Sequence, residues 1–76
     1  MNDVIGEISI TVNGQAYDIA DGIGLPELLR QFDIDPEQAR GIAVAVNDEV
    51  VPRRQWMTYL VREGDRVEIV TAKQGG

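Results

Sequence analysis

The sequence contains no cysteine and no histidine among its 76 residues. Without cysteine the chain forms no disulfide and has no thiol nucleophile. Without histidine it lacks the usual acid–base group of neutral pH. Its one serine, Ser9, has no evident base beside it, and the alternating acids of a calcium loop are absent. These absences argue against catalysis or metal binding by the chain itself.

Basic residues are also scarce. Lys and Arg total 7 against 13 Asp and Glu, which gives a net charge of −6 and a pI near 4.3. Because nucleic-acid binders need clustered basic side chains, we expect no nucleic-acid partner. An acidic surface is instead suited to a basic patch on a protein partner. The sequence has no apolar run of membrane-spanning length and no signal-peptide pattern, so we expect no membrane association and a cytoplasmic location.

A β-hairpin is predicted near the start of the chain. Residues 7–12 alternate apolar and polar side chains, and Asn13-Gly14 is a strong signal for a two-residue hairpin loop before residues 15–19. Such a loop puts the apolar side chains of both strands on one face. It pairs Ile8 with Ile19 and Ile10 with Tyr17.

An amphipathic helix should follow the hairpin. Apolar side chains recur at the spacing of one helical stripe, at Leu25, Leu28, Leu29 and Phe32. Pro26 suits the first turn, where a missing N–H costs nothing. We expect the helix to end by Ile34, because the next residue precedes a proline and is biased out of the α region. Residues 35–38 resemble a capping sequence for one further helical turn, closed by Gly41.

Three further strands and a short helical segment are expected after this point. They are a strand at 42–46, a turn at 47–49, a very short strand at Val50-Val51, a helical segment at 53–60 and a last strand at 66–71. Trp56 and Leu60 are spaced i, i+4, as on one face of a short helix. In the last strand, Val67 and Ile69 should point inward.

This order of elements predicts an α+β fold. It is the β-grasp (ubiquitin-like) arrangement, a mixed sheet of four to five strands with one main helix across one face. We expect residues 1–71 to form this single domain and residues 72–76 to be a flexible C-terminal tail ending in Gly-Gly. The expected core consists of Ile8, Ile10, Ile19, Leu28, Leu29, Phe32, Val44, Trp56, Val67 and Ile69.

The sequence ends in Gly75-Gly76. Glycine has no side chain, so such a tail adopts backbone angles closed to other residues and enters a narrow cleft. The alternative is an ordinary frayed terminus. Because no other residue is equipped for chemistry, we predict that the carboxylate of Gly76 is the reacting group, delivered into the active site of another protein.

Several of these features together resemble the sulfur carrier proteins of thiamine biosynthesis, the ThiS family. The resemblance covers nearly the whole chain from Ile8 onward, and its motif is specific in combination. It consists of Val46-Asn47-Asp48-Glu49-Val50-Val51-Pro52-Arg53-Arg54-Gln55-Trp56, Gly64-Asp65 and Gly75-Gly76.

The resemblance implies a route for the Gly76 carboxylate. A separate activating enzyme would adenylate it with ATP, and the adenylate would become a thiocarboxylate. A sulfur donor protein would supply the sulfur, and a thiazole synthase would receive it to build the thiazole half of thiamine. The chain itself would bind no cofactor. Two departures from the family pattern are the roughly seven residues before the first strand and the polar Lys73-Gln74 before the glycines.

A docking surface for the activating enzyme is expected on the sheet face that the helix leaves open. Ala43, Ala45 and Val70 should lie there as a flat apolar patch. Arg53 and Arg54, the one basic doublet, are expected at its rim.

Three other functions remain compatible with the sequence. The molybdopterin sulfur carrier subunit has the same fold and the same Gly-Gly ending, although the Val-Pro-Arg-x-x-Trp stretch favours the thiamine family. A ubiquitin-like modifier would form amide bonds to lysines of target proteins. The third alternative is an interaction module with an inert tail.

Overall fold

The computed structural model describes residues 6–71 of the chain. Strands and helices follow one another in the order β1 (Glu7–Val12), β2 (Gln15–Ala20), α1 (Leu25–Gln31), β3 (Ile42–Val46), β4 (Glu49–Val50), the 3₁₀ helix η1 (Arg53–Thr58) and β5 (Arg66–Thr71). The predicted tail, residues 72–76, lies outside the described residues.

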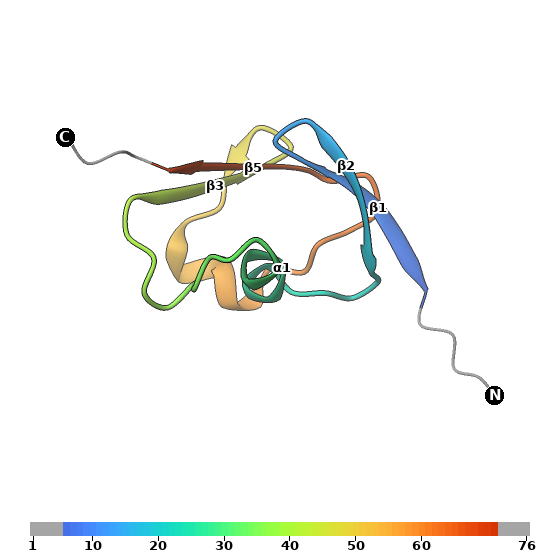
Figure 1. Ribbon diagram of the computed structural model, residues 1–76. Helices are drawn as coiled ribbons and strands as arrows, with labels where there is room; N and C mark the ends of the chain where they lie inside the picture. The colour runs from blue at the N-terminus through green and yellow to red at the C-terminus, as the bar shows by residue number, and fades with distance from the viewer. Residues whose placement is uncertain (1–5, 72–76) are drawn as a thin grey trace.

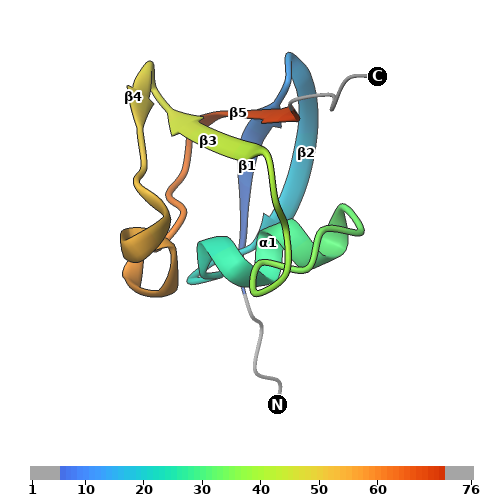
Figure 2. The same cartoon turned by 90° about the vertical axis from the view of Figure 1, so that its left-hand side faces the viewer.

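The strands form one mixed sheet with the order β2-β1-β5-β3-β4. The last strand, β5, lies at the centre, parallel to β1 and antiparallel to β3. Both α1 and η1 lie on the same side of this sheet, and no helix of residues 6–71 lies on the opposite face (Figures 1 and 2). The predicted β-grasp fold is therefore confirmed.

The first hairpin forms with the predicted register. Asn13 and Gly14 both have positive φ, 50° and 84°, as a two-residue turn that matches strand twist requires. Ile8 pairs with Ile19 and Ile10 with Tyr17. The asparagine also ties the turn to the last strand, because its side-chain Oδ1 accepts a hydrogen bond from the Ile69 N–H at 2.8 Å.

Helix α1 ends where the sequence predicts an end, before Ile34. The Phe32 N–H donates to the Leu29 carbonyl, and the Asp33 N–H donates to the Arg30 carbonyl. Asp33 has a positive φ of 64°, which is incompatible with a right-handed helix, so the helix ends here. The chain then makes one further turn. The Asp35 side chain caps it by accepting from the Glu37 N–H at 2.9 Å.

The second hairpin differs from its prediction by one residue. Asn47 and Asp48 both have positive φ, 52° and 72°, and form a two-residue turn rather than a three-residue one. Val46 therefore pairs with Glu49, and the short strand is Glu49–Val50. As strand side chains alternate, Val50 faces outward and Val51 belongs to the core.

The predicted helical segment at 53–60 is shorter than expected. It is a 3₁₀ helix that ends at Thr58, so the i, i+4 spacing of an α-helix does not apply to it. Leu60 lies beyond its end, bridges to Gly24 through the backbone and leaves its side chain 57% exposed. The next residue, Val61, is buried in its place.

The core lies between the sheet and the layer of α1 and η1. Its members are Ile8, Ile10, Val12, Ile19, Ile23, Leu25, Leu28, Leu29, Val44, Val46, Val51, Trp56, Val61 and Val67. Of the residues expected there, only Phe32 and Ile69 are partly buried, and both pack against this cluster. Trp56 satisfies its indole N–H inside the core by donating to the Val51 carbonyl at 2.9 Å.

A buried carboxylate joins the second hairpin to the last strand. Asp65 is only 7% exposed, and its two oxygens accept from the Asn47 amide at 3.0 Å and from the Arg62 N–H at 2.9 Å. Asn47 in turn accepts from the Arg66 N–H at 2.9 Å. Two motif residues, Asn47 and Asp65, therefore hold the β3–β4 turn against the start of β5.

We predict that Leu28→Ala lowers the free energy of unfolding by about 2–5 kcal/mol, because the Leu28 side chain is 0% exposed and its removal leaves a cavity. Leu60→Ala deletes the same atoms from an exposed side chain and should change it by less than about 0.5 kcal/mol. Urea unfolding of both variants measures the difference. Equal losses would contradict the packing described here.

We predict that Asp65→Ala costs about 1–3 kcal/mol, since it leaves the Asn47 amide and the Arg62 N–H without their acceptor. The control is Asp48→Asn, which removes the exposed ion pair with Arg66 but keeps a side chain that tolerates the positive φ of 72° at this position, and it should cost about 0–1 kcal/mol. Thermal unfolding compares the two. A loss at Asp48 as large as that at Asp65 would rule out the buried carboxylate as the main link.

Candidate functional site: the open sheet face

The open face of the sheet carries a continuous group of small and apolar side chains. Ala43 of β3 pairs with Val70 of β5, and Ala45 of β3 pairs with Val50 of β4, on the other side of β3. Paired residues of neighbouring strands point to the same face, so these four side chains lie together. We call them the open-face patch. The structure thus brings together the three residues that the sequence placed there.

Val50 is the member of the patch that the sequence analysis missed. Its side chain is 71% exposed, and that of Val70 is 60% exposed. Val50 and Val70 therefore expose apolar area on the open face, on either side of β3. The signal was present in the sequence as a two-residue strand, but its direction depends on the length of the turn before it.

The patch lies next to the point where the described chain leaves the sheet. The last residue of β5, Thr71, pairs with Ile42, and the neighbouring pair is Ala43 with Val70. Any protein that binds the residues directly after Thr71 therefore comes close to the patch. The predicted reacting residues, Gly75 and Gly76, lie outside the described residues.

The prediction that Arg53 and Arg54 border this face is wrong. Both belong to η1, which lies in the layer of α1 on the other side of the sheet (Figure 2). The Arg53 guanidinium donates to the Pro36 carbonyl at 3.0 Å and lies 5.0 Å from the centre of the Trp56 ring. Arg53 thus packs the turn after α1 onto η1, and Arg54 is exposed on the same layer.

The described part of the chain offers no prepared acid–base group. Burial raises the pKa of the Tyr59 phenol above its ordinary value, and the negative charge of Asp65 raises it further. Its proton is therefore held more tightly than usual at neutral pH. On the open face, the hydrogen bond to Asp48 raises the pKa of Arg66, which stays a fixed cation.

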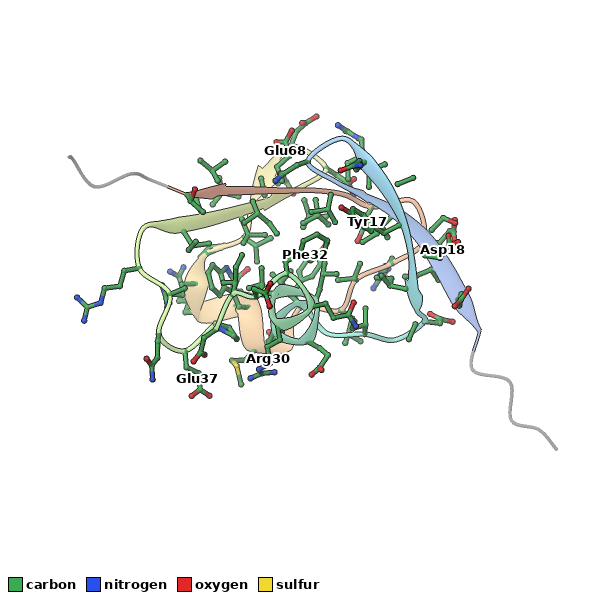
Figure 3. The ribbon with its side chains drawn as sticks, viewed as in Figure 1. Tyr17, Asp18, Arg30, Phe32, Glu37 and Glu68 are labelled. Atoms are coloured by element: carbon green, nitrogen blue, oxygen red, sulfur yellow. The ribbon has the colours of Figure 1, made fainter. Side chains whose placement is uncertain are left out.

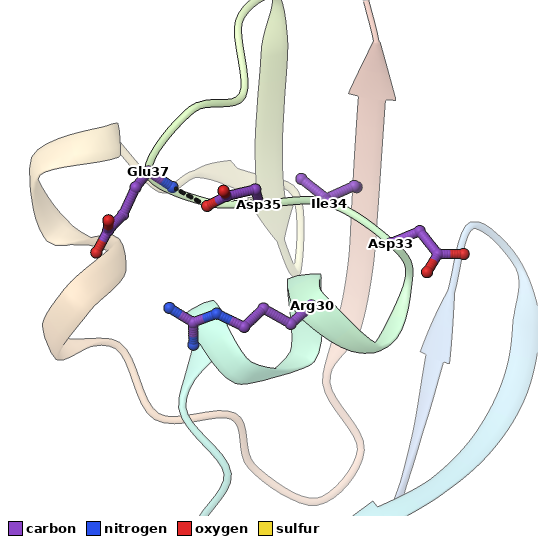
Figure 4. Close-up of a pocket in the computed structure, with 5 residues that line it drawn as sticks. All are labelled: Arg30, Asp33, Ile34, Asp35 and Glu37. Carbon is purple, nitrogen blue, oxygen red and sulfur yellow. Dashed lines mark hydrogen bonds between the residues drawn. The ribbon is translucent and has the colours of Figure 1, made fainter.

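The hollow beside α1 is not an assembled reaction site. Its volume is about 490 Å³, and Arg30, Asp33, Ile34, Asp35 and Glu37 line it. Figure 4 shows the Asp33 carboxylate directed away from Arg30, while Asp35 is used in capping the turn. Within residues 6–71, no three carboxylates gather in a way that would hold a metal ion. Nor does this part of the chain contain a helix long and apolar enough to cross a membrane.

Comparison with known proteins relates the chain to one family. The sequence model of the ThiS family matches residues 10–76. The sulfur carrier protein ThiS of Escherichia coli (strain K12) is 36% identical over 69 residues, which cover 91% of this chain and 100% of that protein. An uncharacterized protein, ycf40, of Porphyra purpurea is 32% identical over 91% of this chain and 93% of its own length.

Comparison with solved structures relates the chain to the same family. The crystal structure of the thiamine biosynthesis protein ThiS from Geobacter metallireducens superposes with a TM-score of 0.75 at 31% sequence identity, over 91% of this chain and 100% of that one. Its solution structure by NMR gives a TM-score of 0.71 at 32% identity, over 91% of this chain and 88% of that one. The sequence match and the shared fold agree, and the chain belongs to the ThiS family.

Proposed function

We propose that this protein is a sulfur carrier of thiamine biosynthesis and is not itself a catalyst. Its support is membership of the ThiS family together with full-length similarity to a relative named as a sulfur carrier protein. In this role the carboxylate of Gly76 is adenylated by a separate activating enzyme and then converted to a thiocarboxylate. The observation that carries the proposal is an apolar patch beside the exit of a chain that ends in Gly75-Gly76.

The proposed chemistry needs activation, because a carboxylate is a poor electrophile. Attack of the Gly76 carboxylate on the α-phosphate of ATP gives the acyl-adenylate and releases pyrophosphate. Hydrosulfide (HS⁻) then attacks the acyl carbon and displaces AMP, and loss of its proton leaves an acyl–S⁻ group. The only sulfur atoms of this chain are the thioethers of Met1 and Met57. The transferred sulfur therefore comes from a donor protein, and the chain binds no cofactor of its own.

The folded body and the tail have separate tasks in this proposal. The body is recognised by the partner, and the five residues after Thr71 supply reach. Fully extended, five residues span roughly 17 Å, enough to enter an active site behind a docked surface. The open-face patch is the docking surface, since it is apolar, exposed and adjacent to the exit.

A second partner then takes the sulfur. We propose that a thiazole synthase receives it from the thiocarboxylate, and that these steps take place in the cytoplasm. The experiment that tests the whole proposal is the intact mass of the protein after incubation with ATP, the activating enzyme of the same organism and a sulfide source. Replacement of one oxygen by sulfur at the C-terminus supports it. Amide conjugates with other proteins would indicate a modifier, and transfer to a pterin precursor would indicate the molybdopterin pathway.

We predict that deleting Gly76 abolishes thiocarboxylate formation and leaves the melting temperature unchanged, because the core is complete without it. Adding one alanine after Gly76 is the positional control. The terminal carboxylate then lies up to about 3.6 Å farther out, and displacements of about 1 Å already slow reactions steeply. Pyrophosphate exchange measures adenylation. Wild-type rates in either variant would overturn the assignment of Gly76.

We predict that Val50→Asp weakens docking on the activating enzyme, since it places a charge on an apolar surface that must lose its water. The KM for the carrier should rise at least about tenfold, with kcat unchanged. Met57→Asp places the same charge on an exposed apolar residue of η1, on the other side of the sheet, and should change neither constant. A normal KM for a folded Val50→Asp variant would place the docking surface elsewhere.

A further inference from the structure

One charged side chain lies within the open-face patch. Glu68 occupies the middle of β5, directly opposite Ala45 and two residues before Val70. Val50 lies on the far side of Ala45. Figure 3 shows the Glu68 side chain above the sheet, on the face opposite to α1. A carboxylate is therefore surrounded by the side chains that a docking partner would cover.

Within residues 6–71 the Glu68 carboxylate accepts no hydrogen bond and forms no ion pair, unlike two other acids of the open face, Asp18 and Asp48. Asp18 accepts from the Ser9 hydroxyl at 3.0 Å, and Asp48 pairs with Arg66 at 3.1 Å. The charge of Glu68 contributes to the raised pKa of Arg66, but the Arg66 guanidinium donates its hydrogen bond to Asp48. Glu68 is exposed, so its carboxylate is open to water on the described surface.

Docking of a partner on the patch changes the solvation of the Glu68 carboxylate. A partner that covers Ala45, Val50 and Val70 also removes water from Glu68. A carboxylate that loses its water without gaining a counter-charge is strongly unfavourable, whereas one that gains a cation is tolerated and specific. The partner must therefore supply a positive group at this position.

We propose that Glu68 selects the partner on the open face, and that this partner is the activating enzyme, which presents an arginine or lysine to it. The inference rests on the function proposed above and adds a specificity residue to it. The net charge of −6 favours the same kind of partner, because an acidic carrier is attracted to a basic surface.

A second copy of this chain does not fit the face. Two open faces brought together place their Glu68 carboxylates in one apolar interface, and Arg66, a basic side chain on the same face, is already paired with Asp48. Like charges in such an interface are repulsive. Glu68 therefore also keeps two exposed apolar patches from associating with each other.

The test compares Glu68→Gln and Glu68→Lys with Glu37→Lys. Glu37 lies on the opposite side of the molecule (Figure 3), so its reversal makes the same change in net charge away from the patch. Adenylation by the activating enzyme is measured at saturating ATP. We expect kcat/KM to fall about tenfold for Glu68→Gln and about 100-fold for Glu68→Lys, all in KM, and to change by less than about threefold for Glu37→Lys.

Ionic strength provides a second readout. The Debye length shortens from about 30 Å at 0.01 M to about 8 Å at 0.15 M salt, so the wild-type kcat/KM should fall with salt more steeply than that of Glu68→Gln. Melting temperatures check that each variant is folded. Equal behaviour of Glu68→Lys and Glu37→Lys would overturn the proposal. So would self-association of Glu68→Gln with unchanged adenylation, or a loss confined to sulfur transfer. If the wild-type protein is not adenylated at all, the proposed function itself fails.

Discussion

The structure depends on the parallel pairing of β1 with β5. Thr11 pairs with Arg66 and Val12 with Val67, which brings the last strand between β1 and β3. A parallel pair needs a long crossover, and here the crossover contains almost all of the remaining chain. Because α1 and η1 both belong to that crossover and lie on one side, the sheet has one covered face and one open face (Figure 1).

Strand β5 then serves both faces through simple alternation. Val67 is buried in the core, while Glu68 and Val70 point to the open face. Two polar side chains hold the strand in this register, one at its start and one near its middle. Asp65 holds its start through Asn47, and Asn13 bonds the backbone of Ile69. These hydrogen bonds help to fix the register of β5 and therefore the positions of Glu68 and Val70 on the open face.

In the proposed function, recognition and chemistry are separate. The described body has neither histidine nor cysteine, and its buried carboxylate, Asp65, is already used to join two turns. What the body offers is a shape: an apolar surface that contains the Glu68 carboxylate, next to the point where β5 ends. A reacting carboxylate carried on a tail needs only this. In that proposal the partner supplies the catalytic groups, and docking supplies the proximity that makes them effective.

The position of Glu68 is also relevant to the two exposed valines of the open face. Val50 and Val70 would favour non-specific association if they formed an uninterrupted apolar surface. Glu68 interrupts that surface without a partner of its own in the described chain. A charge inside an apolar patch makes association weaker for most surfaces and selective for those that carry a cation.

Local patterns in the sequence were enough to predict most of the secondary-structure elements, and the family motif is a feature of the sequence itself. Asn13-Gly14 sets a hairpin because only residues that accept positive φ form that turn, and the leucine stripe sets one face of α1 because of its helical spacing. The tertiary structure decided what local patterns do not contain. The two-residue turn at Asn47-Asp48 turned Val50 outward, the 3₁₀ geometry of η1 left Leu60 exposed, and the packing of Arg53 on Trp56 took it away from the open face. Likewise, Glu68 became a feature of the patch only when β3 and β5 paired, because which side chains become neighbours across a sheet depends on contacts between residues far apart in the chain.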